Sequence, residues 1–393
     1  MRILYICDQS PFEHYNGSQQ RSGLLLDALC LRGQVDLVCF TSDATPHSVL
    51  NPNCNIKFFE ELPAISRARI VQRIVKLTNL LFSLSPYSVY NKNSIAYDIT
   101  HDLLKFNDYN YIVIRYIKNA FMCGLFKDKR IIVDIDDLPE QSILSYLEIN
   151  RLHRIRYFQY RYYALRAKFH TNRFIKGIYH SFCSNKFQCE WINSSYLPNI
   201  PFPALNSNNN PDEMYSSDDN IVLFVGFLVH TPNFQGVQYF LDNIWGCIRE
   251  AIPNAIFKIA GKGVSPEQKI AWEMYEGVHV LGFVSDIQSE YKKCRVVAIP
   301  IYSGAGSNIK VLEAMSLKKA TVISEFASRP FKDQLIENKN IMIAHNPKDF
   351  ADKVIKLLID KKLNSDIAEN AAKLISENYS YSNFLSAVHK YIV

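Results

Sequence analysis

The chain has 393 residues, of which 48% are hydrophobic and 21% are charged, with 14 Gly and 16 Pro. These values are ordinary for a globular protein, and they exclude a disordered tail, a collagen and a coiled coil. At roughly 100–200 residues per domain, the length predicts two or three domains. The formal net charge of +6 identifies no partner by itself, so its distribution along the chain matters more.

Short apolar runs alternate with amphipathic segments in the first half of the chain. In Ser22–Leu31, Leu and Ala recur at the spacing of a helix. Strands that alternate with helices form parallel sheets covered on both faces, so we predict such a sheet. The runs expected to form its strands are Ile3–Cys7, Val35–Phe40, Ile56–Phe59, Tyr111–Ile114, Ile131–Ile135 and Ile175–Cys183.

A polar, turn-rich segment at residues 203–220 interrupts this pattern, and the alternation then resumes. We therefore predict an α/β protein with two doubly wound parallel-sheet domains and a central cleft between them. The expected domains are 1–205 and 221–380, joined by a linker at 206–220, with a helix at 381–393 that packs back on the first domain. The second set of expected strands is Ile221–Val225, Ala255–Ile259, Val278–Leu281, Val296–Ile301, Thr321–Ile323 and Ile341–Ala344, and its clear helices are Val237–Arg249, Ile309–Ser316 and Phe350–Ile359.

The nine cysteines form no CxxC pair, and we expect nine reduced thiols, several of them on buried strands. The apolar run at Ile3–Cys7 is shorter than the core of a signal peptide, which needs about 7–15 apolar residues. No run approaches the roughly 18 apolar residues that span a bilayer. These features predict a protein kept in the cytoplasm.

Two loops at expected strand ends are candidate ligand sites, because ligands of open parallel sheets bind there, near helix N-termini. After the first strand, Asn16 and Gly17 would let backbone N–H groups approach a ligand, although the GxGxxG fingerprint is absent; a plain helix cap is the alternative. The stronger candidate is residues 300–308, which open a helix containing Lys310 and Glu313. Its glycines permit a tight turn, and a helix start beside a lysine suits an anion. The alternative is an Asn-capped helix with an incidental ion pair.

Three carboxylates, Asp134, Asp136 and Asp137, end another buried strand. In an extended chain the first two point to one side and the third to the other. Such a group can bind a metal, act as a base, hold sugar hydroxyls or cap the next helix. The Asp-Ile-Asp pattern alone is too weak a signal to favour a metal.

The positive charge is concentrated in the first domain. Residues 62–186 contain 20 Lys and Arg against 9 Asp and Glu, and no acidic residue occurs between Glu148 and Glu190. Eight of the basic residues lie between Arg151 and Lys176, interleaved with Tyr and Phe. A face of this kind suits an anionic membrane or a lipid-linked phosphate, while a solvated face and nucleic acid are the alternatives.

Taken in order, several segments of the second domain resemble the nucleotide-sugar-binding domain of family 4 glycosyltransferases, which have the GT-B fold of two Rossmann-like domains. The segments that carry this resemblance are Leu223–Phe227, Pro232–Gly236, Phe257–Gly263, Val280–Asp286, Ala305–Met315 and Thr321–Ser324. In the first domain the resemblance is looser and rests on Arg2–Asp8, Gly17, Leu24–Leu29 and Asp134–Leu138.

The chain departs from the family pattern at several positions. The family motif has two glutamates separated by seven residues; Glu313 matches the second, but Ala305 occupies the first. Asp136 stands where a His is common, and His230 and Gln235 lie in the loop that usually carries an Arg and a Lys. These changes bear on the donor sugar and on the catalytic contacts more than on the fold.

The resemblance implies a retaining glycosyltransferase that uses a nucleotide-diphosphate sugar. Glu313 would then bind ribose hydroxyls, and the backbone N–H groups of Gly306–Ile309 would bind the diphosphate with help from Lys310. Catalytic candidates are Asp136 and Lys310, and acceptor-side candidates are Arg21 and Arg115. The donor-binding candidates are Asn16, Gly17, Gly226, Phe227, Gly261, Phe283, Gly306, Ser307, Asn308, Ile309, Lys310 and Glu313.

The expected partners are the nucleotide-sugar donor, a glycan or lipid-linked acceptor of cell-surface polysaccharide or lipopolysaccharide synthesis, and an anionic membrane surface. Neither nucleic acid nor a metal cofactor is expected. The location implied is the cytoplasm, including the inner face of the membrane. The alternatives are a nucleotide-sugar 2-epimerase of the same fold and a non-catalytic sugar-binding or scaffold protein, which Ala305 favours.

Overall fold

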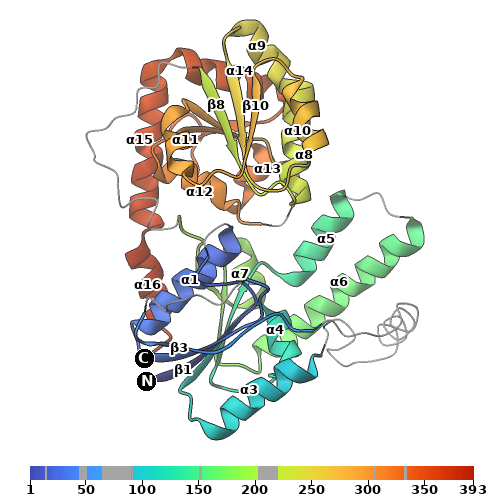
Figure 1. Cartoon of the computed structure of the whole chain (residues 1–393), viewed down its shortest axis with the longest axis vertical. Helices are drawn as coiled ribbons and strands as arrows, with labels where there is room; N and C mark the ends of the chain where they lie inside the picture. Colours follow the sequence, from blue (N-terminus) through green and yellow to red (C-terminus); the bar gives the residue numbers. More distant parts are fainter. Residues whose placement is uncertain are drawn as a thin grey trace. The chain divides into compact units, whose positions relative to one another are not determined.

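The computed structural model describes residues 1–13, 16–43, 51–63, 90, 92–149, 153–201, 220–304, 306–331 and 334–393. By its internal contacts the chain divides into two compact units (Figure 1). The first unit consists of Met1–Asn199 together with Phe384–Val393, and the second unit is Ile200–Asn383. Most of the expected linker, residues 206–219, and Ala305 lie outside the described residues.

The first unit is built on a seven-stranded sheet in the order β3-β2-β1-β4-β5-β6-β7, with every neighbouring pair parallel. All six expected strands occur, and β7 is a further strand of two residues, too short to leave an apolar run. The sixth begins later than expected, because Ile175 is the last residue of a helix. The strands are β1 (Arg2–Cys7), β2 (Gln34–Cys39), β3 (Cys54–Phe59), β4 (Tyr111–Arg115), β5 (Ile131–Asp136), β6 (His180–Cys183) and β7 (Ser195–Tyr196).

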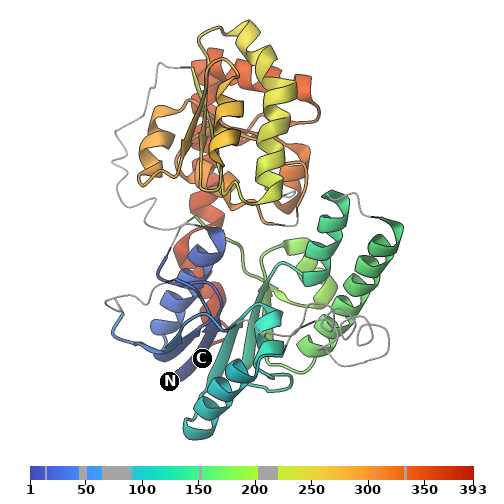
Figure 2. The same ribbon diagram turned by 45° about the vertical axis from the view of Figure 1, so that its right-hand side comes forward.

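Helices flank this sheet, and its central strands are buried on both faces. Ile3, Ile112 and Ile131 are completely buried, which explains why these strands show continuous apolar runs. Helices α5 and α6 run side by side as a hairpin (Figure 2). The described helices of this unit are α1 (Gly17–Cys30), α3 (Ser94–Phe106), α4 (Ile117–Met122), α5 (Pro139–Ile149), α6 (Arg154–Ile175), α7 (Lys186–Ile192) and the greater part of α16 (Tyr381–His389).

The C-terminal residues complete the first unit. A ring nitrogen of His389 lies 2.8 Å from the carbonyl oxygen of Ala28, and the Tyr391 ring stacks on His180 with centroids 3.5 Å apart. The Tyr391 hydroxyl lies 2.7 Å from that of Ser195. The two chain ends therefore lie side by side, as both views show (Figures 1 and 2).

The second unit contains a six-stranded parallel sheet in the order β10-β9-β8-β11-β12-β13. All six expected strands occur. The fourth ends at Ile299 rather than Ile301, because Pro300 has no backbone N–H to donate to a neighbouring strand. The strands are β8 (Ile221–Val225), β9 (Ile256–Ala260), β10 (Val278–Gly282), β11 (Val296–Ile299), β12 (Ala320–Ser324) and β13 (Met342–Ala344).

The helices of the second unit follow the expected alternation with one difference. The expected helix Val237–Arg249 is part of a longer helical segment that a π-helical stretch, Leu241–Trp245, interrupts. None of the described helices in either unit is long and apolar enough to span a bilayer. The remaining helices are α8 (Thr231–Phe240), α9 (Gly246–Ala251), α10 (Pro266–Glu273), α11 (Ile287–Lys293), α12 (Ile309–Ser316), α13 (Glu325–Ser328), α14 (Pro347–Ile359) and α15 (Lys361–Asn378), with a 3-10 turn at Arg329–Phe331.

These results confirm the prediction of two parallel α/β domains. Each sheet reverses its strand order near the middle, between β1 and β4 in the first unit and between β8 and β11 in the second. Ligands of doubly wound folds bind outside the carboxyl ends of the strands at such switch points. All nine cysteines are free thiols, and eight are buried.

Candidate functional site

The loops after β8, β9 and β10 are joined at the carboxyl edge of the second sheet. The Gly226 amide donates to the carbonyl of Ala260 (3.0 Å), and the Gly261 amide donates to that of Gly282 (2.7 Å). A Cβ atom at Gly261 would lie 1.8 Å from the Gly226 carbonyl oxygen, and the φ of Gly261 is +149°. Only glycine fits there, which explains the glycine expected after the second strand of this domain.

Replacing Gly261 with alanine should lower the free energy of unfolding of the second unit by about 2–3 kcal/mol, because the backbone must move to admit the methyl group. Gly246→Ala is the control, since its Cβ would meet no atom within 4 Å and alanine favours a helix. Urea unfolding measures both. Equal stabilities of the two variants would refute the assigned role of Gly261.

Two aromatic rings remain exposed at this edge. Phe227 and Phe283 are 45% and 53% exposed, and the Lys262 ammonium lies 4.5 Å from the Phe283 ring centroid. Exposed rings with a nearby cation can stack on a flat, electron-rich group such as a nucleobase. The four donor candidates of these loops, Gly226, Phe227, Gly261 and Phe283, thus come together.

The start of helix α12 is arranged for an anion. Asn308 has left-handed backbone angles (φ 48°, ψ 49°), and its side chain makes no capping hydrogen bond but donates to the carbonyl of Ala327 (3.2 Å). The Asn-capped alternative is therefore wrong, and no Asn308 side-chain oxygen occupies the first N–H groups of the helix. A Cβ at exposed Gly306 would meet nothing within 4 Å, so this loop has open space beside it; Ser307 and Ile309 are half-buried.

Lys310 supplies a cation to this helix start. Burial lowers the pKa of its ammonium to about 8, although nearby Glu313, one turn further along α12, opposes the shift. Burial and the charge of Lys310 also lower the pKa of His230, which precedes α8. Within the described ranges, the Lys310 ammonium has no hydrogen bond or ion pair. A desolvated cation beside a helix start that the Asn308 side chain does not cap would be stabilised by a diphosphate.

The lowered pKa of Lys310 predicts a pH dependence. The ammonium loses its proton as pH rises through about 8, so the affinity for a nucleoside diphosphate should fall above that pH, by at most about tenfold per unit. Lys310→Arg should bind with little change up to about pH 9.5, because arginine stays protonated. Calorimetric titrations with UDP across this range provide the measurement. Parallel pH profiles of the two proteins would contradict the assignment.

In the first unit, Asp134 lies between two buried arginines. Arg21 of α1 donates through Nε (2.8 Å) and Nη2 (2.7 Å) to its two carboxylate oxygens, and Arg115 at the end of β4 donates through Nη1 (2.5 Å). Burial alone would raise the pKa of Asp134, but the charges of Arg21 and Arg115 outweigh it and lower this pKa. The ion pair between Arg21 and Asp134 therefore fixes α1 against the centre of the sheet.

The same arginines hold Asp136 at the end of β5. Arg115 Nη2 donates to one Asp136 oxygen (3.3 Å), and Asn199 Nδ2 donates to the other (3.3 Å). Arg21 and Arg115, the acceptor-side candidates, are both fully buried and bound to carboxylates, because their charges need anionic partners inside the unit. In this place they orient Asp134 and Asp136.

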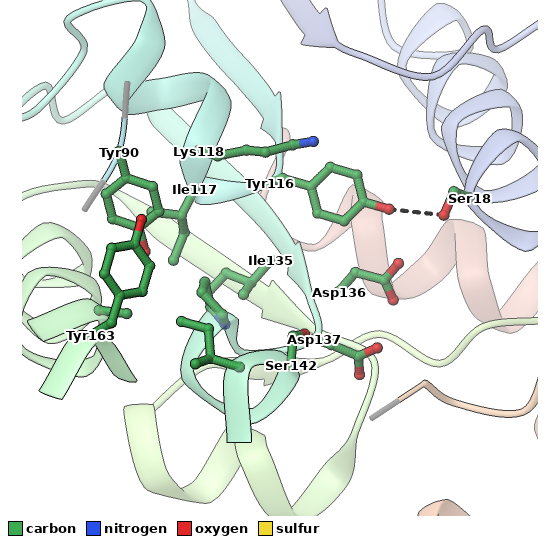
Figure 3. A pocket seen from close by; sticks show the side chains of 13 residues that line it. Ser18, Tyr90, Tyr116, Ile117, Lys118, Ile135, Asp136, Asp137, Ser142 and Tyr163 are labelled. Carbon is green, nitrogen blue, oxygen red and sulfur yellow. Dashed lines mark hydrogen bonds between the residues drawn. The ribbon is translucent and has the colours of Figure 1, made fainter. Parts of the chain in front are cut away.

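A pocket of about 560 Å³ opens beside Asp136 (Figure 3). Its polar end contains Asp136 and Asp137, near Tyr116, whose hydroxyl donates to Ser18 Oγ (3.0 Å). Tyr90 and Tyr163 lie at its other, more apolar end. The remaining lining residues are Ile117, Lys118, Ile135, Pro139, Ser142, Ile143 and Ala167. Such a mixed lining suits a sugar ring, with hydroxyls at one end and an apolar face at the other.

Backbone strain marks the polar end of this pocket. Tyr116 and Asp136 have positive φ values of 61° and 63°, which are unfavourable for residues other than glycine. Strain of this kind persists only where the surroundings enforce it, and it clusters at functional sites. Burial, and next the negative charge of Asp136, raise the pKa of Asp137 well above its usual value.

The first-strand loop leads into α1. The Asn16 side chain accepts a hydrogen bond from the Gln19 amide (3.0 Å), so Asn16 caps this helix, and Gly17 is the first helical residue. Three residues that line the pocket, Ser18, Tyr116 and Lys118, were not predicted from the sequence. Their one sequence signal is that Tyr116 and Lys118 lie within three residues of the end of a buried strand, and that Ser18 lies next to Gly17. Among the described residues, no three His, Cys, Asp or Glu side chains gather as a metal site.

Solved structures with this architecture cover nearly the whole chain. Sucrose-phosphate synthase from Thermosynechococcus elongatus has a TM-score of 0.71 at 12% identity, over 99% of this chain and 98% of that one. WaaG, a glycosyltransferase involved in lipopolysaccharide biosynthesis, has a TM-score of 0.66 at 13% identity, over 98% of this chain and 99% of that one. The fold is GT-B. HepE of Anabaena, solved in complex with UDP, has a TM-score of 0.61 at 14% identity, over 99% of each chain.

Sequence comparison points the same way for the second unit. Residues 219–360 match the family model described as Glycosyl transferases group 1. A Klebsiella pneumoniae protein, described as an uncharacterized 44.6 kDa protein in the cps region, is 28% identical over 176 residues, 43% of this chain and 45% of its own length. The N,N'-diacetylbacillosaminyl-diphospho-undecaprenol alpha-1,3-N-acetylgalactosaminyltransferase of Campylobacter jejuni is 34% identical over 102 residues, 24% of this chain and 25% of its own. The chain thus spans less than half the length of the curated relatives it matches.

Proposed function

We propose that this protein transfers a sugar, with retention of anomeric configuration, from a nucleoside-diphosphate sugar to a glycan or lipid-linked acceptor of cell-surface polysaccharide synthesis. The observation that carries the proposal is the start of α12, where Lys310 lies beside Glu313 and the Asn308 side chain does not cap the helix. The family match over residues 219–360 supports the same reading of this unit.

The donor would bind the carboxyl edge of the second sheet. The diphosphate would accept hydrogen bonds from the amides at the start of α12 and a charge-assisted bond from Lys310. Glu313 would accept hydrogen bonds from the ribose hydroxyls, since a carboxylate beside a phosphate needs a donor of its own. The base would lie against the loops after β9 and β10, where Phe283 is exposed. HepE, which shares the fold, was solved with UDP.

The acceptor would bind the pocket of the first unit. Its hydroxyls would meet Asp136 and Asp137, and its apolar face would lie toward Tyr90 and Tyr163. Arg115 and Asn199 would keep the Asp136 carboxylate oriented. The Campylobacter jejuni relative, by its name, uses an undecaprenol-linked acceptor, which supports a lipid-linked one here.

In the proposed reaction, the bond between the anomeric carbon and the diphosphate oxygen breaks as the acceptor oxygen bonds to the same face of that carbon. The acceptor proton passes to the departing phosphate oxygen. Lys310 and the amides of α12 stabilise the negative charge that develops on the diphosphate, which lowers the barrier.

A screen of nucleoside diphosphates and their sugars by thermal unfolding tests the donor class, because a ligand that binds the folded state raises Tm. The sugar nucleotide that binds is then incubated with and without lipid-linked acceptors. Transfer with retained configuration, seen by NMR, is the expected result. Conversion of the donor without any acceptor would indicate the epimerase instead, and binding without turnover a scaffold protein.

A further inference from the structure

The outward face of α6 carries a stripe of apolar side chains that the described residues of the first unit leave exposed. Ile155, Phe158, Leu165 and Phe169 are 73%, 69%, 66% and 47% exposed. They recur with Tyr162 at spacings of three and four residues, so they share one side of the helix. From Ile155 to Phe169 the stripe is about 21 Å long, at 1.5 Å per residue.

The opposite side of α6 already serves the core. Ala164, Ala167, Thr171 and Phe174 are buried there, and α6 packs against α5. The outward stripe is therefore an additional apolar face. Its exposure to water costs free energy unless something covers it.

Positive charges border this stripe. Arg154, Arg161 and Lys168 follow one another at seven-residue intervals along one edge, and Arg166 and Arg173 lie along the other. No Asp or Glu occurs in the sequence between Glu148 and Glu190. In the described part of the chain, Arg154, Arg161 and Arg173 form no ion pair.

We infer that the α6 stripe docks the protein on an anionic lipid surface. Its aromatic and aliphatic side chains would enter the boundary between head groups and acyl chains, while the bordering Arg and Lys would meet lipid phosphates. A second copy of the chain fits poorly, because it would bring two Arg-rich faces together without acidic partners. The inference rests on α6 alone, so it does not require the proposed transfer reaction.

Vesicle flotation with the full chain tests this. The wild type should bind vesicles containing phosphatidylglycerol, bind pure phosphatidylcholine more weakly, and dissociate at high salt. Phe158→Ser with Leu165→Ser should weaken binding about tenfold. Neutralising Arg154, Arg161 and Lys168 with Gln should weaken it by about fivefold for each charge removed.

Matched variants of the second unit serve as controls. Ile270→Ser with Met274→Ser removes two exposed apolar side chains, and Lys348→Gln, Lys356→Gln and Lys362→Gln remove three exposed charges. These variants should float like the wild type. The inference fails if the wild type does not bind phosphatidylglycerol vesicles, or if the α6 variants bind as well as the controls. It also fails if the α6 substitutions abolish self-association or oligonucleotide binding but leave vesicle binding unchanged. Vesicle binding by a protein without transferase activity would refute the proposed function and leave this inference standing.

Discussion

Replacing Asp134 with asparagine should lower the free energy of unfolding by about 3–5 kcal/mol, which is the range for breaking a buried ion pair. The substitution keeps the shape of the side chain but leaves the charges of Arg21 and Arg115 without their shared partner. Urea unfolding measures the loss, and hydrogen exchange of the β5 amides assigns the transition to the first unit.

Two further carboxylates provide the controls. Asp137→Asn should leave stability unchanged or raise it at neutral pH, because burial and the charge of Asp136 already disfavour the ionised form of Asp137. Asp128→Asn breaks the part-exposed pair with Arg130 and should cost less than about 1 kcal/mol. If Asp134→Asn costs no more than Asp128→Asn, the cluster does not hold the unit together.

The pH dependence of these two aspartates has opposite signs. The pKa of Asp134 is lowered in the folded state, so its contribution is present above the unfolded pKa of about 3.9 and is lost as pH falls through the folded value. The pKa of Asp137 is raised, so its ionisation costs stability as pH rises through the folded value. Asp137→Asn should therefore raise the free energy of unfolding most at high pH.

Lys310→Ala should weaken UDP binding about 10–100-fold, because it removes a charge-assisted hydrogen bond to the diphosphate. Glu313→Ala should weaken UDP binding by a similar factor through the lost ribose contact. The two variants should differ in their affinity for inorganic pyrophosphate, which has no ribose. Lys310→Ala should bind pyrophosphate more weakly than the wild type, and Glu313→Ala should bind it equally well.

Lys318→Ala is the matched control, because Lys318 is exposed at the opposite end of α12. Calorimetry gives the affinities, and thermal unfolding without ligand shows whether each variant folds. Unchanged UDP affinity in both Lys310→Ala and Glu313→Ala would overturn the donor site. Loss of pyrophosphate binding in Glu313→Ala would overturn the ribose contact.

The strands were predictable from the sequence for a physical reason. A parallel strand buried on both faces needs apolar side chains at every position, and runs such as Ile131–Val133 provide them. The start of α12 was predictable because its loop glycines and Lys310 are neighbours in sequence.

The first-unit site was harder to predict because it depends on distant pairs. Arg21 lies 113 residues from Asp134 in sequence, and nothing local distinguishes a buried, paired arginine from one that binds an acceptor. Tyr116 owes its place in the pocket to an unfavourable backbone conformation that only the folded unit enforces. The three aspartates at the end of β5 therefore marked this end of the sheet as a candidate site. They did not show which side chains face the pocket.

The return of residues 384–393 to the first unit has a consequence for chain cleavage. The second unit is one continuous segment, whereas the first unit is assembled from two segments that flank it in sequence. A cut after Asn383 would keep every residue of the second unit but would remove from the first unit the ring that stacks on His180 and the buried Ile392. Cleavage next to the second unit should therefore destabilise the first unit, whose other residues lie far away in sequence.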